Sequence, residues 1–176
     1  MRNKIKTYSV ILAVLSVGLG SCLKDSPYMD VSNTQPIIEF GLGPSTAPLY
    51  LSYPQPYTVA VGTAATDTTV ALVVASPSPL GVGHPVTITV KFDTGVLNAY
   101  NAANGTSLIP LPTSLFTLVD TATIATNHVI GRIKVHFNFP AFDFTKSYAF
   151  PLSISNGDGL IISGNNSTFI WTFSRP

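Results

Sequence analysis

The stretch VIGRIKVHF, residues 129–137, decides the fold, because apolar and polar side chains alternate along most of its length. Successive side chains of an extended strand point to opposite faces, so this pattern predicts a strand with one buried face. The same alternation recurs at residues 86–92, 148–154 and 169–173. Clusters of Gly, Pro, Asn and Asp separate these segments, as is typical of turns. Several short strands with this spacing predict an all-β protein, folded as a sandwich or a barrel.

Other segments complete the expected strand set. Residues 70–74 are apolar throughout, which predicts a central strand. Weaker strands are expected near residues 36–40, 48–53, 57–62 and 115–119. Pro151 cannot donate a hydrogen bond to a neighbouring strand, so we expect it at a sheet edge or a bulge. Trp171 shares the apolar register of its strand, which predicts a place in the core rather than on a sugar-binding surface.

One segment, DTGVLNAYNAANG, places its apolar residues at helical spacing instead of alternating. Asp93 or Thr94 can cap the start of a helix here. Gly105 can adopt the left-handed conformation that closes one. We therefore expect one short crossover helix at about residues 95–104.

The composition excludes several classes of protein. Charged residues make up 10% of the 176 residues, too few for a coiled coil or a long helical bundle. A formal net charge of +1 with 45% hydrophobic residues is not typical of a disordered chain. The chain has no surplus of cations to neutralise phosphates, so we expect no nucleic acid among its partners. Its length suits a single domain.

The N-terminus has the features of an export signal. Three cations within the first six residues precede a short apolar run at residues 8–19. A transmembrane helix is the alternative, but it needs about 20 apolar residues. The run ends in Leu19-Gly20-Ser21-Cys22, which resembles the bacterial lipobox, where small residues precede a lipid-bearing Cys. We predict a lipoprotein signal peptide at residues 1–21, cleavage between Ser21 and Cys22, and lipid attached to Cys22.

The predicted leader has consequences for organisation and location. Residues 22–35 are polar and without periodicity, which predicts a flexible tether, and residues 36–176 would form the β-sandwich domain. Loss of the three N-terminal cations would change the formal net charge from +1 to −2. We expect a cell-envelope, outer-membrane lipoprotein, surface-exposed or facing the periplasm, held to the membrane by its N-terminal lipid.

Part of the sequence resembles a known family. The segment AYNAANGT at residues 99–106, followed by Leu111-Pro112, resembles the signature of a Bacteroidetes lipoprotein domain called domain of unknown function 1735. The segments PVTITV at residues 85–90 and YAFPLSI at residues 148–154 resemble further strands of that family. The resemblance implies an immunoglobulin-like antiparallel β-sandwich in lipoproteins linked to glycan capture and utilisation. In many family members this domain precedes a glycan-binding or glycosidase domain.

The chain offers little for catalysis. Its eight carboxylates are scattered, mostly beside turn-forming residues, and its three His residues lack metal-ligand spacing. It has no Gly-x-Ser-x-Gly motif and no phosphate-binding Gly loop. We therefore expect no catalytic residue, no metal site and no cofactor.

The candidate binding residues are aromatic. Tyr50, Tyr53 and Tyr57 cluster in a Pro-rich stretch, where their rings can stack on sugar rings, although packing on the neighbouring Pro residues is the alternative. Two short Asp-Thr motifs resemble the acceptor of Bacteroidetes O-glycosylation, which makes Thr68 and Thr121 candidate modification sites.

Two functions remain open at this point. The first is a lipid-anchored, non-enzymatic cell-envelope domain that is an accessory to glycan binding or acquisition, with a polysaccharide or a glycan-uptake complex as its partner. The alternative is a structural, docking or adhesin-like interaction module that binds no sugar.

Overall fold

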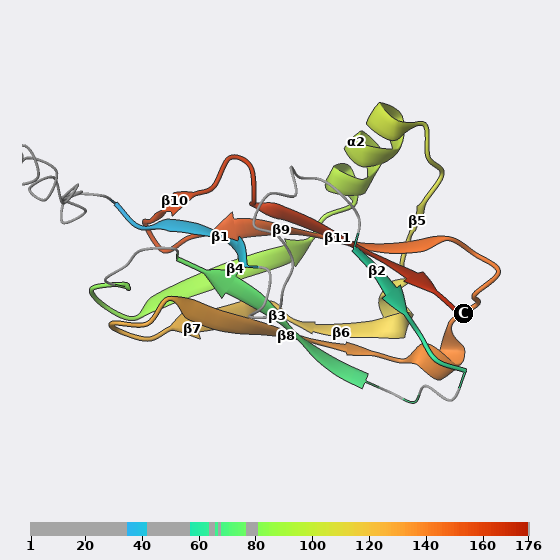
Figure 1. The fold of residues 1–176 in the computed structure, drawn as a ribbon, viewed down its shortest axis with the longest axis horizontal. Coiled ribbons are helices and arrows are strands. Elements are labelled where there is room, and N and C mark those ends of the chain that lie inside the picture. Colours follow the sequence, from blue (N-terminus) through green and yellow to red (C-terminus); the bar gives the residue numbers. More distant parts are fainter. Residues whose placement is uncertain (1–34, 42–56, 64–65, 67, 77–80, 176) are drawn as a thin grey trace, which may run out of the picture. The chain divides into compact units, whose positions relative to one another are not determined.

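The fold consists of two β-sheets that enclose one core. The computed structural model describes residues 35–41, 57–63, 66, 68–76 and 81–175. Residues 35–176 form one compact unit. The all-β class predicted from the alternating segments is confirmed, as is a single short helix among the described residues (Figure 1).

The first sheet has five strands. Its strand order is β10 (Ile161–Ile162), β1 (Ile37–Gly41), β3 (Thr68–Ala75), β8 (Ile130–Phe137) and β6 (Phe116–Val119). The predicted central strand within residues 70–74 is β3, which pairs with β1 on one side and β8 on the other. The decisive stretch is β8, whose residues 131, 133, 135 and 137 are buried while residues 130, 132 and 134 are exposed.

The second sheet has six strands. Five of them are neighbours in the order β2 (Tyr57–Ala60), β11 (Thr168–Ser174), β9 (Tyr148–Asn156), β4 (Val86–Phe92) and β7 (Thr121–Ile124). The sixth strand, β5 (Ile109–Pro110), also pairs with β9. Two 3₁₀ turns, Thr113–Leu115 and Phe139–Ala141, precede β6 and follow β8. The expected strand near residues 48–53 lies outside the described residues.

Most strand pairs are antiparallel, but three are parallel: β1 with β10, β2 with β11, and β5 with β9. Each parallel pair includes a strand of four residues or fewer, which reaches its partner from a segment distant in the sequence. Parallel neighbours need such long connections, so local sequence patterns do not reveal them.

Aromatic side chains dominate the core between the sheets. The Phe137 ring makes edge contacts with Phe150, Trp171 and Phe173, at centroid distances of 5.2, 5.7 and 5.2 Å. Edge-to-face pairs at this distance add to the stabilisation from burial alone. Trp171 is only 5% exposed, which confirms its prediction as a core residue.

The helix α2 spans Thr94–Asn104 and lies on the outer face of the six-stranded sheet (Figure 1). Asp93 caps its start by accepting a hydrogen bond from the Gly95 N–H, and Gly105 closes it at φ 63°. Both ends agree with the sequence prediction. Leu97 packs against Ala149 and Ile170 in a second, smaller apolar cluster.

The helix α2 connects two strands of the same sheet. The helix follows β4 and leads to β5, and both of these strands belong to the six-stranded sheet. The chain passes to the other sheet only afterwards, at the turn before β6. The helix therefore covers one sheet, and residues 148–154 of β9 are buried on both faces.

Pro151 departs from the expected edge or bulge position, because it lies in β9, an interior strand. On one side of β9, β4 pairs with residues 152–156 and β5 pairs with Tyr148 and Ala149. Pro151 falls between these two neighbours, where no strand requires its missing N–H. Its carbonyl still accepts a hydrogen bond from the Asp93 N–H at 3.0 Å.

Candidate functional site

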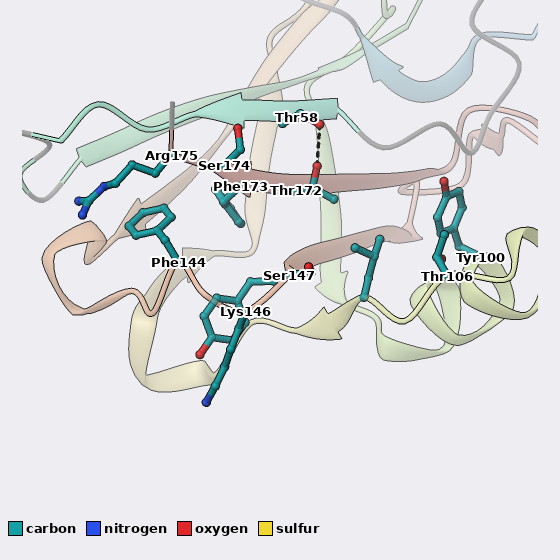
Figure 2. Close-up of a pocket in the computed structure, with 12 residues that line it drawn as sticks. Thr58, Tyr100, Thr106, Phe144, Lys146, Ser147, Thr172, Phe173, Ser174 and Arg175 are labelled. Carbon is teal, nitrogen blue, oxygen red and sulfur yellow. Dashed lines mark hydrogen bonds between the residues drawn. The ribbon is translucent and has the colours of Figure 1, made fainter.

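A groove of about 600 Å³ lies on the outer face of the six-stranded sheet, next to α2. Four chain segments line it: β2, the end of α2 with its following loop, the loop before β9, and the end of β11 (Figure 2). Its volume is within the range of about 300–1,000 Å³ that is typical of small-molecule sites.

The floor of the groove carries hydroxyl groups because of the strand register. Trp171 and Phe173 face the core, so Thr172 faces outward, beyond the part of the sheet that α2 covers. Thr172 pairs with Thr58 of the parallel neighbour β2, and their hydroxyl oxygens are 2.9 Å apart. Both hydroxyls can also exchange hydrogen bonds with a ligand.

One wall is built by Asn101 of α2. Its side-chain oxygen accepts hydrogen bonds from the Thr106 hydroxyl at 2.7 Å and the Leu108 N–H at 3.2 Å. Its side-chain NH₂ donates to the Leu108 carbonyl at 2.8 Å. This single amide holds the loop after the helix against the groove, where Thr106, Leu108 and half-buried Tyr100 form the wall.

The other end of the groove combines a ring with cations. The Arg175 guanidinium carbon lies 4.4 Å from the centroid of the Phe144 ring, a cation–π contact. Lys146 Nζ is 3.7 Å from Asp143 Oδ2. Hydrogen bonds from the Thr145 side chain and backbone, followed by the charge of Lys146, lower the pKa of Asp143, so this carboxylate is ionised at neutral pH.

Polar groups and rings alternate along the groove. Figure 2 shows Tyr100 and Thr106 at one end, Phe144 and Arg175 at the other, and the Thr58–Thr172 pair between them. Among the described residues, the lining includes Lys146 and Arg175 but no Asp or Glu. The arrangement provides apolar ring faces, hydroxyl groups and cationic donors, a combination suited to noncovalent binding of a polyhydroxylated ligand.

The lining residues that the structure describes include no His, Cys, Asp or Glu. Within the described ranges, no cluster of three or more His, Cys, Asp or Glu residues is arranged to hold a metal ion. Among those same residues, no helix has both the length and the hydropathy that crossing a bilayer requires.

Three residues singled out from the sequence, Tyr57, Thr68 and Thr121, belong to the described part of the chain, and none of them lines this groove. Tyr57 begins β2, one position before the groove residue Thr58, and is 55% exposed. Neighbouring residues of a strand point to opposite faces, so its ring lies on the other side of β2. It stays a candidate for stacking, but separately from the groove.

The other candidates from the sequence are two tyrosines, the lipidation site and two threonines for O-glycosylation. Tyr50, Tyr53, Ser21 and Cys22 lie outside the described residues. Thr68 is the first residue of β3, and Thr121 is the first residue of β7 and is exposed. Their proposed modifications stay predictions.

Sequence reasoning missed the groove residues themselves. Tyr100 belongs to the helical segment and to the family-like signature, but neither pattern indicates a binding role for its ring. The quoted signature AYNAANGT did contain a usable signal, because its Asn101 and Thr106 build the groove wall.

Comparison with family descriptions gives one clear match. A family model described as an N-terminal domain matches residues 45–161, about two thirds of the chain. A search of curated proteins found no match.

Several solved structures share the fold. A candidate carbohydrate-binding protein from Bacteroides ovatus is 19% identical, with a TM-score of 0.62 over 80% of this chain and 37% of that one. A multidomain protein from Bacteroides ovatus that includes DUF1735 is 13% identical, with a TM-score of 0.63 over 79% and 45%. A Bacteroides thetaiotaomicron endoglycosidase with a Man5GlcNAc product is 21% identical, with a TM-score of 0.52 over 67% and 28%. The chain thus spans less than half the length of each of these three proteins.

Proposed function

The chain belongs to the family of N-terminal domains similar to domain of unknown function 1735, and on this premise we propose that it is a non-enzymatic glycan-binding accessory domain. The main support for this proposal is the groove beside α2, where the rings of Tyr100 and Phe144 flank the hydroxyl-lined floor. Sugar rings present both apolar faces and hydroxyl groups, so they match both kinds of surface.

The accessory role is supported by the groove's chemistry and by the similar structures. The described residues of its lining supply cations, hydroxyl groups and rings, but no carboxylate pair of the kind that hydrolyses glycosidic bonds. Two of the similar structures are described by carbohydrate-related names, a candidate carbohydrate-binding protein and an endoglycosidase. We expect this domain to hold a glycan near the cell envelope, anchored through lipid on Cys22.

Affinity electrophoresis against a panel of polysaccharides tests the proposal. The mature chain from residue 22, with Cys22→Ala to avoid lipid, should be retarded by at least one glycan. Thr172→Val keeps the shape of the side chain but removes its hydroxyl, and should weaken the retardation several-fold. Tyr100→Ala should weaken it at least as much, because it removes a stacking face.

Tyr57→Ala is the matched control for Tyr100→Ala, since it removes the same side chain from β2, at a position outside the groove. Equal unfolding midpoints for the wild type and Thr172→Val would show that the fold is intact. If Tyr57→Ala abolishes retardation and the groove variants do not, the stacking site predicted from the sequence is correct and the groove is not the site. If no glycan retards the wild type, the proposal fails.

A specific surface favours the second candidate function, a docking module. Arg132 and Lys134 project from the outer face of the five-stranded sheet, where neither forms an ion pair with another described residue. Ile130 on the same strand and Val119 on its neighbour β6 are 41% and 51% exposed. Adjacent exposed apolar and cationic side chains are typical of a protein-binding surface.

A further inference from the structure

We infer that the groove selects a glycan that carries an anionic group, either the carboxylate of a uronic acid or a sulfate ester. This inference rests on the proposed glycan-binding function and adds the charge of the ligand. Its starting point is the one-sided charge of the lining, whose described residues include Lys146 and Arg175 but no Asp or Glu. Once the predicted leader is removed, the chain as a whole would carry a formal charge of −2. The groove would then be a local cationic site on a weakly acidic mature chain.

Arg175 is the cation best placed to bind the anion. Its guanidinium carbon lies 4.4 Å from the centroid of the Phe144 ring, a cation–π contact. The contact uses no N–H donor of the guanidinium group, so these donors can make a bidentate contact with carboxylate or sulfate oxygens. No other described residue forms an ion pair or hydrogen bond with Arg175. The contact with the ring also reduces the side-chain freedom that a ligand would otherwise have to restrict.

Lys146 has a secondary role because its charge is already shared. Asp143 Oδ2 lies 3.7 Å from Lys146 Nζ, and the lowered pKa of Asp143 keeps this carboxylate charged. The ion pair offsets part of the attraction at Lys146, and Asp143 repels an anion placed beside it. The anionic group should therefore lie on the Arg175 side of this end of the groove.

The rest of the groove is suited to the neutral part of the same ligand. Tyr100 and Thr106 lie at the end away from Arg175, and the Thr58–Thr172 hydroxyl pair lies between (Figure 2). A saccharide with its charged group at Arg175 would extend its hydroxyls over this pair and reach the Tyr100 ring. Arg175 would then provide the selectivity for an anionic group. The rings and hydroxyl groups of the remaining groove would provide affinity for sugars in general.

Matched pairs of polysaccharides test the inference with the mature chain carrying Cys22→Ala. Polygalacturonate is compared with its methyl ester, and dextran sulfate with dextran, in affinity gels at neutral pH. We expect the charged member of at least one pair to bind about tenfold more tightly than its neutral form. The pair that shows the difference identifies carboxylate or sulfate as the preferred anion.

Two charge-removing variants identify the residue responsible. Arg175→Gln should remove the preference for the charged member, so that the charged and neutral members of a pair bind about equally. Arg132→Gln removes another exposed cation, from the five-stranded sheet, and should have little effect. Equal losses in both variants would mean that binding follows the total charge of the protein, which would overturn the inference.

The outcomes also separate this inference from the proposed function. If neutral and charged glycans bind alike and Tyr100→Ala weakens both, the groove binds glycans but the charge preference is wrong. If neither member of any pair binds, both the proposed function and the inference fail.

Discussion

At the scale of single residues, Asp93 links the helix to the sheet beneath it. Its carboxylate accepts hydrogen bonds from the Gly95 N–H at 3.0 Å and the Ser153 hydroxyl at 2.8 Å, and it lies 3.1 Å from Lys91 Nζ. Burial alone would raise the pKa of Asp93, but the contacts with Ser153, Lys91 and Gly95 together lower it below its usual value. The sequence identified Asp93 as a cap, yet its contact with Ser153, 60 positions away, depends on the folded sheet.

The lowered pKa predicts an acid-sensitive contribution to stability. A carboxylate whose pKa is lower in the folded state stabilises the protein above its unfolded pKa, and this contribution disappears as pH falls through the folded pKa. Asp93→Asn keeps a good capping residue but removes the charge, so the free energy of unfolding should fall by about 1 kcal/mol or less at pH 7. The difference between variant and wild type should shrink towards pH 3 in urea titrations.

Asp120→Asn is the control for this prediction, because Asp120 is exposed and its side chain makes no hydrogen bond or ion pair with another described residue. At pH 7 it should change the free energy of unfolding by less than Asp93→Asn does, because it removes no such contacts. A difference between Asp93→Asn and wild type that stays constant from pH 7 to pH 3 would contradict the assigned role of the charge.

At the scale of secondary-structure elements, α2 and its closing loop act as one unit. The helix packs on the sheet through Leu97, while Asn101 ties Thr106 and Leu108 to its last turn. Helix start and end could be predicted because capping depends on neighbouring residues. The role of Asn101 could not, because its partners become apparent only once the loop folds back on the helix.

Asn101→Ala should therefore affect the groove more than the helix. It removes three hydrogen bonds to the loop, so we expect a stability loss of about 1–3 kcal/mol and weaker glycan retardation. Chemical denaturation and affinity gels measure the two effects. Asn98→Ala, an exposed position on the same helix, is the matched control and should change neither. Unchanged binding in Asn101→Ala would mean that the loop does not shape the site.

At the scale of the whole molecule, the two sheets enclose an aromatic core and leave three surfaces with separate chemistry. The groove beside α2 has rings, hydroxyls and cations, the outer face of the five-stranded sheet has Arg132 and Lys134, and the start of β2 exposes Tyr57. Tyr100→Ala tests the groove, Arg132→Gln tests the outer face of the five-stranded sheet, and Tyr57→Ala tests the start of β2.

The predicted membrane anchor also belongs to this scale. Cells that express the full chain and are labelled with a clickable fatty acid should incorporate label into the wild type, because Cys22 follows a lipobox-like sequence. Cys22→Ala should lose the label completely, while Ser26→Ala, a nearby polar position, should retain it. Label that persists in Cys22→Ala would show that the lipid is attached elsewhere or that the leader is processed differently.

The sequence by itself determined the features that depend on neighbouring residues. The alternation in residues 129–137 predicted the buried face of β8, and Asp93 and Gly105 predicted the ends of α2. These predictions succeed because strand faces and helix caps follow from periodicity and local hydrogen bonding.

Only the tertiary structure decided where the groove lies and what lines it. Thr58 and Thr172 are 114 positions apart, yet parallel pairing of β2 with β11 brings their hydroxyls within 2.9 Å. The helix covers Ile170 and leaves Thr172 open, and the Phe144 ring receives Arg175 from another segment. Long-range pairing and packing created this site, because each segment alone carries only ordinary Thr, Phe and Arg residues without a motif.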